Sequence, residues 1–144
     1  MKNDIQAAKA CVVDFYQHLD NAAPDALDGI MRRYTSNDYL WRGYHPFNEQ
    51  TSVEQVTQLF WQPLRLALTH LQRRQDVFMA GRNEMDGFES IWVVSMGHLM
   101  GLFDQPWLGI AATGKLTMLR YCEFHKVQDG KITETAMYFD IPHL

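Results

Sequence analysis

The chain has 144 residues, of which 47% are hydrophobic, 12% aromatic and 21% charged. This size and balance predict a single globular domain over residues 1–144, large enough to bury a core without a disulfide or metal. The formal net charge is −4, and the basic residues form no cluster beyond two Arg-Arg pairs, which argues against nucleic-acid binding.

The first residues and the cysteines bear on where the protein works. The N-terminus lacks the apolar run of a signal peptide, and no stretch approaches the roughly 18 apolar residues of a membrane span. Cys11 falls in a helical pattern and Cys122 in a strand pattern, so two reduced, buried thiols are expected rather than a disulfide. We therefore expect a cytoplasmic protein that makes no membrane contact.

Helical patterns open the chain. Apolar residues recur at three- and four-residue steps from Asp4 to Leu19, which predicts an amphipathic helix. Residues 21–25 interrupt this pattern, and a shorter helix follows over residues 27–34, with Pro24 in its first turn.

A further helix is predicted after a short strand within residues 37–43. Ser52 and Gln55 have the spacing of a capping box, and apolar residues continue at helical steps to Leu68. Pro63 removes a backbone donor in the middle of this pattern, so it should kink the helix or divide it in two.

The second half of the chain changes to strand patterns. Four strands separated by glycine-bearing turns are expected over residues 71–80, 88–103, 116–127 and 132–141. Helices first and strands afterwards indicate the α+β class, with an antiparallel sheet covered by helices on one side.

The last two strands are predicted to pair through a two-residue turn at Asp129-Gly130. In that register His125 faces Glu134, Glu123 faces Ala136, Tyr121 faces Tyr138 and Leu119 faces Asp140. His125 and Glu134 are best explained as a cross-strand ion pair. Glu123 and Asp140 lie farther in, where each carboxylate is either a hydrogen-bonded structural group or a catalytic one.

The other face of this hairpin is also substantially apolar. It is predicted to carry Met118, Arg120, Cys122 and Phe124 opposite Ile141, Phe139, Met137 and Thr135. A sheet with helices on one face needs a second cover for such a surface. We therefore expect a homodimer formed through the sheet.

Several segments together resemble a known family. The run Leu-Gly-Ile-Ala-Ala-Thr-Gly-Lys over residues 108–115, the run Asp-Gly-Lys-Ile over residues 129–132, and Asp140 stand in the order and spacing of the SnoaL-like polyketide cyclases. These belong to the nuclear transport factor 2-like superfamily. The resemblance spans nearly the whole chain and implies a cone, in which a curved antiparallel sheet and N-terminal helices enclose an apolar pocket.

The resemblance also implies a site. An aspartate on the last strand of these cyclases serves as acid and base in an intramolecular aldol ring closure, and that position corresponds to Asp140. A histidine near the end of the preceding long strand corresponds approximately to His98. Where the family has a tryptophan and an acidic residue after Glu134, this chain has Ala136 and Met137.

A hydrophobic pocket would suit this chemistry, because burial raises the pKa of a carboxyl group toward the range of a useful base. Its walls are expected to comprise Trp41, Trp92, Met96, Tyr121 and Tyr138. His45 would rim the pocket or simply bond within its loop, and Glu123 would orient His98 or a substrate hydroxyl. His98 is otherwise a half-buried histidine with a satisfied hydrogen bond.

These expectations describe a cofactor-independent enzyme acting on a hydrophobic carbonyl substrate. The histidines lack the spacing of a metal site, and no phosphate loop or nucleophile motif is present. A dehydratase or isomerase could use the same acid and base. The alternative is a noncatalytic module of the same fold that binds a small molecule or another protein.

Overall fold

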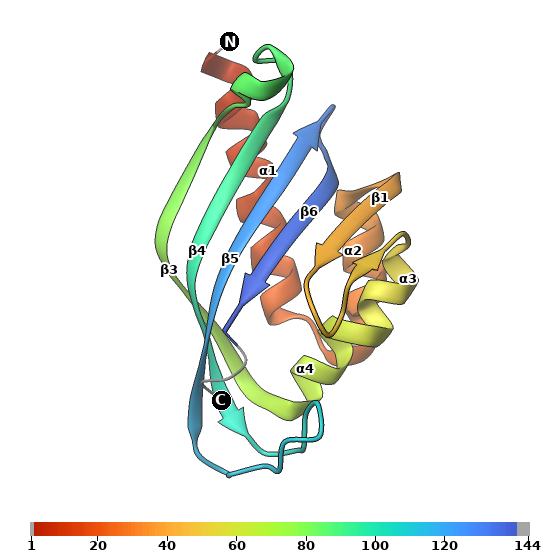
Figure 1. Ribbon diagram of the computed structural model, residues 1–144, viewed down its shortest axis with the longest axis vertical. Coiled ribbons are helices and arrows are strands. Elements are labelled where there is room, and N and C mark those ends of the chain that lie inside the picture. Colours follow the sequence, from red (N-terminus) through yellow and green to blue (C-terminus); the bar gives the residue numbers. More distant parts are fainter. Residues whose placement is uncertain (1, 141–144) are drawn as a thin grey trace.

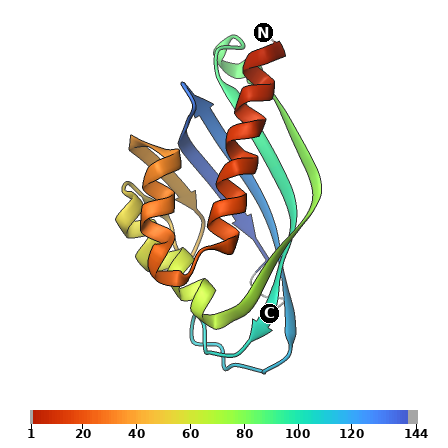
Figure 2. The same ribbon diagram turned by 180° about the vertical axis from the view of Figure 1, so that it is seen from behind.

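A curved sheet and the helices that cover one of its faces make up the chain (Figures 1 and 2). The computed structural model describes residues 2–140. The helical elements are α1 (Lys2–Asn21), η1 (Pro24–Ala26), α2 (Leu27–Tyr34), α3 (Val53–Val56), η2 (Thr57–Trp61), α4 (Gln62–Ala67) and η3 (Glu84–Asp86). The strands are β1 (Thr35–Gly43), β2 (Glu49–Gln50), β3 (Leu68–Arg82), β4 (Ile91–Phe103), β5 (Leu116–Gln128) and β6 (Lys131–Phe139).

The amphipathic helix predicted at the N-terminus is confirmed as α1, which runs along the sheet (Figure 2). Its buried stripe includes Val12, Phe15, Tyr16 and Leu19. At its C-terminal end, the Arg65 guanidinium donates to the carbonyl oxygens of Leu19 and Ala22, both at 2.7 Å. These bonds occupy carbonyl groups that have no partner within the helix. Arg65 thereby fixes the end of α1 against α4.

The helix predicted from Ser52 forms as three consecutive segments, α3, η2 and α4, and a boundary lies next to Pro63. The Gln55 backbone N–H donates to Ser52 Oγ at 3.1 Å, which confirms the N-cap. The next turn, η2, is π-helical, and Pro63 lies in the first turn of α4, where a missing backbone donor costs little. The proline thus begins the last helical segment instead of interrupting it.

All six strands join one sheet in the order β2-β1-β6-β5-β4-β3. Neighbours are antiparallel except β1 and β6, which run parallel, so the expectation of a wholly antiparallel sheet is wrong at that pair. The long strand β4 begins at Ile91 rather than at residue 88, because η3 and Gly87 form the turn before it. Strand β6 ends at Phe139, and Ile141 lies outside the described residues.

The register of the last hairpin differs from the predicted one. Gln128 pairs with Lys131 and Val127 with Ile132, as expected, but a β-bulge then shifts the pairing by one residue. His125 consequently lies opposite Thr135 and Glu123 opposite Met137. A one-residue shift moves every later side chain to the other face of the sheet. The predicted pairing beyond Ile132 is therefore wrong, and so are both predicted faces of β6.

We call the face that packs on the helices the inner face and the opposite one the outer face. The inner face of β6 now carries Ile132, Thr135 and Met137, all buried. At one end of the interior, aromatic rings pack edge-on or stacked around Phe60, a group formed by Trp41, Phe47, Phe60, Trp107 and Phe139. A Cβ atom on Gly43 would lie 2.1 Å from the Trp41 ring, so this position admits only glycine beside that indole.

Among residues 2–140, no helix has the length and apolar character needed to cross a membrane. Cys11 and Cys122 are unpaired, as expected, although each is only partly buried.

Candidate functional site

The structure divides the predicted site residues between the two faces of the sheet. Buried on the inner face are Trp41, Tyr121 and Glu123. Four others lie on the outer face, because they alternate with the buried residues of their strands: Trp92, Met96 and His98 on β4, and Tyr138 on β6. His45 is exposed in the turn between β1 and β2. The expectation that these residues surround one pocket is therefore wrong.

Asp140 and His98 lie on either side of Arg120. His98 pairs with Arg120 across β4 and β5, and the Asp140 backbone N–H donates to the Arg120 carbonyl oxygen at 3.2 Å. His98 Nδ1 is 3.5 Å from Asp76 Oδ2 on the outer face. The catalytic roles assigned to Asp140 and His98 stay predictions, and the alternation along β4 places His98 away from the inner face.

The inner face instead holds a cluster of titratable side chains, which we call the inner cluster: Tyr16, Arg73, Glu123 and His125. The Tyr16 hydroxyl donates to Glu123 Oε1 at 2.9 Å and lies 2.8 Å from His125 Nε2. Arg73 Nη1 donates to the same Glu123 oxygen at 2.8 Å. One carboxylate oxygen thus accepts hydrogen bonds from a phenol and a guanidinium. The phenol oxygen also lies within hydrogen-bonding distance of an imidazole nitrogen.

Arg73 links the inner cluster to the C-terminal half of α1. Its Nε donates to Asp20 Oδ2 at 2.8 Å and its Nη2 to Asp20 Oδ1 at 3.3 Å. The guanidinium also lies 3.6 Å from the centroid of the Tyr16 ring, a cation–π contact. Burial alone would lower the pKa of Arg73, but Tyr16, Asp20 and Glu123 together hold it well above its ordinary value. The buried cation is therefore permanently charged and neutralised by two carboxylates.

His125 is held on both ring nitrogens. Its Nδ1 lies 2.8 Å from Thr135 Oγ1, the residue that the bulge brings opposite it. Burial lowers the pKa of His125 to about 4, although Glu123 acts in the opposite direction, so the ring is neutral near pH 7. The predicted ion pair between His125 and Glu134 is wrong, because Glu134 lies on the outer face, 3.5 Å from Arg42.

The hydroxyl proton of Tyr16 is firmly bound. Burial, with a further contribution from Glu123, raises the pKa of Tyr16 well above its ordinary value. The second oxygen of Glu123, Oε2, is buried and accepts no hydrogen bond from the described residues, though it lies 3.5 Å from His125 Nε2. A buried acceptor without a hydrogen-bond donor is energetically costly.

Sequence reasoning missed Tyr16, Asp20, Arg73 and Thr135. Tyr16 looked like one more member of the apolar stripe of α1, and Asp20 follows it by one helical turn. Arg73 could have been found, because it lies two residues after Leu71 in a predicted strand. Residues at this spacing point to the same face of a sheet, here the buried face of an apolar residue. Thr135 could not be placed without the bulge.

A groove between α1 and β3, with a volume of about 540 Å³, reaches the inner cluster. Tyr16, Asp20 and Arg73 are among the residues that line it. A second groove of about 510 Å³ lies on the outer face beside Trp92, Phe124 and Tyr138. Neither groove is lined by Asp140 or His98. A small molecule in the α1–β3 groove would lie beside two residues of the inner cluster, Tyr16 and Arg73.

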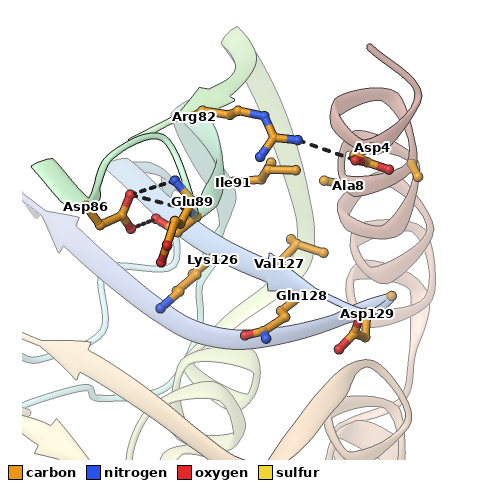
Figure 3. Close-up of a pocket in the computed structure, with 13 residues that line it drawn as sticks. Asp4, Ala8, Arg82, Asp86, Glu89, Ile91, Lys126, Val127, Gln128 and Asp129 are labelled. Atoms are coloured by element: carbon orange, nitrogen blue, oxygen red, sulfur yellow. Dashed lines mark hydrogen bonds and ion pairs between the residues drawn. The ribbon is translucent and has the colours of Figure 1, made fainter. Parts of the chain in front are cut away.

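A third cavity, of about 480 Å³, lies between the start of α1 and the tips of the two long hairpins (Figure 3). We call it the rim cavity. It is strongly charged, with four carboxylates and two cations, namely Asp4, Asp86, Glu89, Asp129, Arg82 and Lys126. Arg82 reaches Asp4 at 3.3 Å, and Asp86 accepts hydrogen bonds from Ser90 and Glu89. Within the described part of the chain, no three histidine, cysteine or carboxylate side chains gather as a metal site.

The fold is that of the SnoaL-like polyketide cyclases and other nuclear transport factor 2-like proteins, as predicted. A proposed SnoaL-like polyketide cyclase from Jannaschia sp. CCS1 superposes with a TM-score of 0.74 at 16% identity, over 96% of this chain and 88% of that one. AclR, a proposed hydroxylase from Streptomyces galilaeus, gives 0.72 at 18% identity, over 96% and 92%. An NTF2-like protein from Burkholderia thailandensis E264 gives 0.64 at 16% identity, over 94% and 92%.

No protein-family model matches the sequence, and no curated protein matches it either. At these identities the likeness establishes the fold alone. The first two of these similar structures are assigned different activities, one as a cyclase and one as a hydroxylase, so the reaction has to be argued from the site.

Proposed function

We propose that the protein is a cofactor-independent acid/base enzyme of the SnoaL-like kind that acts on a carbonyl-bearing small molecule. The observation that carries this proposal is the Tyr16 hydroxyl, which lies within 2.9 Å of both Glu123 and His125 while Tyr16 lines the α1–β3 groove. In this proposal the Tyr16 hydroxyl links a substrate in the groove to the buried Glu123 carboxylate, which accepts its hydrogen bond. Membership of the SnoaL-like family is part of this proposal.

The inner cluster can move a proton in either direction. When a substrate C–H next to a carbonyl gives its proton to Tyr16 Oη, the proton of Tyr16 passes along its existing hydrogen bond to Glu123 Oε1, and the substrate becomes an enolate. The reverse transfer protonates the oxygen or carbon formed in the next step, which restores all groups. His125 Nε2, 2.8 Å from Tyr16 Oη, helps to hold that oxygen in place during the transfer. Aldol ring closure, isomerisation and dehydration all begin with this proton abstraction.

Hydrogen–deuterium exchange tests this function without knowledge of the final product. Wild-type protein is incubated in D₂O with a panel of cyclic and aryl ketones such as 1-tetralone, and loss of the α-hydrogen signal is followed by NMR. We expect accelerated exchange for wild type and loss of the acceleration in Tyr16→Phe. Tyr44→Phe, on the exposed outer face, is the matched control and should behave as wild type.

Other outcomes of this experiment identify other sites. Equal exchange in wild type and Tyr16→Phe would overturn the role of the inner cluster. Loss of exchange in Asp140→Asn or His98→Gln, with Tyr16→Phe unaffected, would support the catalytic pair implied by the family resemblance. The mass of any product then separates dehydration, which loses water, from isomerisation, which does not.

A noncatalytic small-molecule-binding module is the second candidate. It is favoured by the closure of the inner cluster, because Glu123 and His125 are each only 1% exposed. Their network would then serve to hold α1 on the sheet. Ketones that bind, as seen by chemical-shift changes in the groove, but undergo no accelerated exchange would support this candidate.

We also propose that the protein works in the cytoplasm.

We further propose that the outer face pairs with a second copy. The support for this dimer is a patch of large exposed apolar side chains over β3–β6, namely Met79, Met96, Leu102, Leu116, Met118 and Tyr138. Sedimentation at micromolar concentration should give a dimer, and Met96→Glu should give a monomer. Leu66→Glu, on the helical side, is the control that should remain dimeric. A wild-type monomer would contradict the proposal.

A further inference from the structure

The α1–β3 groove differs from the other cavities in the chemistry of its polar groups. Its lining includes four carboxamides, contributed by Gln17 and Asn21 of α1 and by Gln72 and Gln75 of β3. Asn21 donates to the Gln17 carbonyl oxygen at 2.7 Å. The side chains of Gln17, Gln72 and Gln75 are exposed and engage none of the described residues. They are therefore available to a ligand.

The groove presents no net charge. Asp20 and Arg73 are the charged residues of its lining, and they bind each other through two hydrogen bonds, at 2.8 and 3.3 Å. An anionic ligand would compete with Asp20 for Arg73, and a cationic one would compete with Arg73 for Asp20. The rim cavity, with four carboxylates and two cations, offers the contrasting environment. Charge complementarity thus favours a neutral occupant for the groove.

Hydroxyl groups are the neutral partners that fit this lining best. Each carboxamide offers both a donor and an acceptor, which matches a pair of neighbouring hydroxyls. Val13 and Leu71 supply an apolar strip between the amides, suited to the C–H face of a saturated ring.

We propose that the α1–β3 groove binds a neutral, hydroxyl-rich ring such as a sugar, free or carried by a larger substrate. The proposal concerns binding and does not depend on the proton relay. Three methyl glycosides of similar shape test it: methyl β-glucopyranoside is neutral, methyl β-glucuronide carries a carboxylate, and methyl β-glucosaminide carries an ammonium group. Titration followed by backbone amide NMR locates each ligand and gives its affinity.

The neutral glucoside is expected to shift amide signals of α1 and β3 around Gln17 and Gln72, and to bind more tightly than either charged analogue. Replacing Gln72 and Gln75 together by Leu should weaken glucoside binding by about tenfold or more, since each lost hydrogen bond is worth several-fold in affinity. Gln128→Leu is the matched control, because Gln128 lines the rim cavity, and it should leave glucoside binding unchanged.

Three results would overturn the proposal. They are the absence of glucoside shifts in the groove, tighter binding of a charged analogue, and unchanged affinity in the Gln72/Gln75 double variant. Unfolding of that variant is detected in the same NMR spectra, and Gln72→Leu alone then serves in its place. Because no turnover is measured, these results are separate from those of the ketone exchange experiment.

Discussion

Strands β3 to β6 carry ionisable side chains on both faces of the sheet, and the two sets differ in how closely they are held. On the inner face, Arg73 reaches Glu123 and Asp20 at 2.8 Å. On the outer face, Arg42 lies 3.5 Å from Glu134, and Asp76 lies 3.4 Å from Arg74 and 3.5 Å from His98. The two faces of one sheet thus support a tight buried network and a loose exposed one.

The difference follows from solvent. A buried charge loses its hydration and is tolerated only with partners at hydrogen-bonding distance, whereas exposed ions are hydrated and gain little from pairing. Removing one member of the inner network should therefore cost far more than removing an outer ion. Four predictions test this contrast, each at a particular residue.

The largest effect is expected for Arg73→Ala. This change leaves Glu123 and Asp20 without their cation, and breaking a buried ion pair typically lowers the free energy of unfolding by about 3–5 kcal/mol. Urea denaturation followed by circular dichroism measures the loss. Arg74→Ala is the adjacent control on the outer face, where the side chain is 65% exposed, and it should change stability by less than about 1 kcal/mol. Equal effects would refute the contrast.

The next effect is a pH dependence set by His125, whose pKa burial lowers from 6.5 to about 4. The unfolded chain takes up a proton on this residue as the pH falls below about 6.5, but the folded protein does not until about pH 4. Stability contributed by neutral His125 is therefore complete above pH 6.5 and declines toward pH 4, by up to roughly 3 kcal/mol. His125→Gln should reduce the pH dependence of the free energy of unfolding in this range, as measured by urea denaturation at several pH values. An unchanged slope would contradict the role given to His125.

Tyr16→Phe should have a smaller effect than either. Glu123 keeps its bond to Arg73, but His125 Nε2 loses its hydroxyl partner. An unsatisfied buried polar atom costs about 1–3 kcal/mol, and thermal unfolding measures the difference. The ring remains beneath the guanidinium, so the cation–π contact at 3.6 Å is preserved. Tyr16→Leu, which removes that contact too, should be less stable than Tyr16→Phe.

The long helices and strands and the α+β class could be predicted from the sequence because each depends on local periodicity, whereas the short elements β2 and η3 were missed. The Ser52 cap, the Pro63 division and the turn at Asp129-Gly130 follow from residue chemistry within a few positions. The candidate site could not be predicted in the same way. A single bulge after Ile132 sends Glu134 outward, and no local pattern marks the position of such a bulge.

The inner cluster also depends on contacts between distant segments. Tyr16 and Glu123 are 107 residues apart in the chain, and Tyr16 has the spacing of an ordinary core residue. Nothing in its neighbourhood distinguishes a tyrosine that bonds to a buried carboxylate from one that merely packs. The resemblance to the SnoaL-like family predicted the fold, but of the implied pair His98 lies on the outer face of β4, away from the network on the inner face.

The smallest effect is expected for Tyr138→Phe, the outer counterpart of Tyr16→Phe. Tyr138 is 44% exposed, and its hydroxyl lies 2.8 Å from that of Tyr44 while the two rings stack at 4.5 Å. Water replaces the lost hydroxyl bond and the stack remains, so the free energy of unfolding should change by less than about 0.5 kcal/mol.

The hydrogen bond with Tyr44, followed by burial, raises the pKa of Tyr138. Tyr44→Phe should therefore lower that pKa, which ultraviolet titration of the phenol detects, while leaving stability nearly unchanged. A Tyr138 pKa that depends on Tyr44, in a pair that contributes little to stability, would complete the contrast with Tyr16, whose single hydroxyl is expected to matter because no water can replace it. A stability loss in Tyr138→Phe equal to that in Tyr16→Phe would show that burial is not the deciding variable.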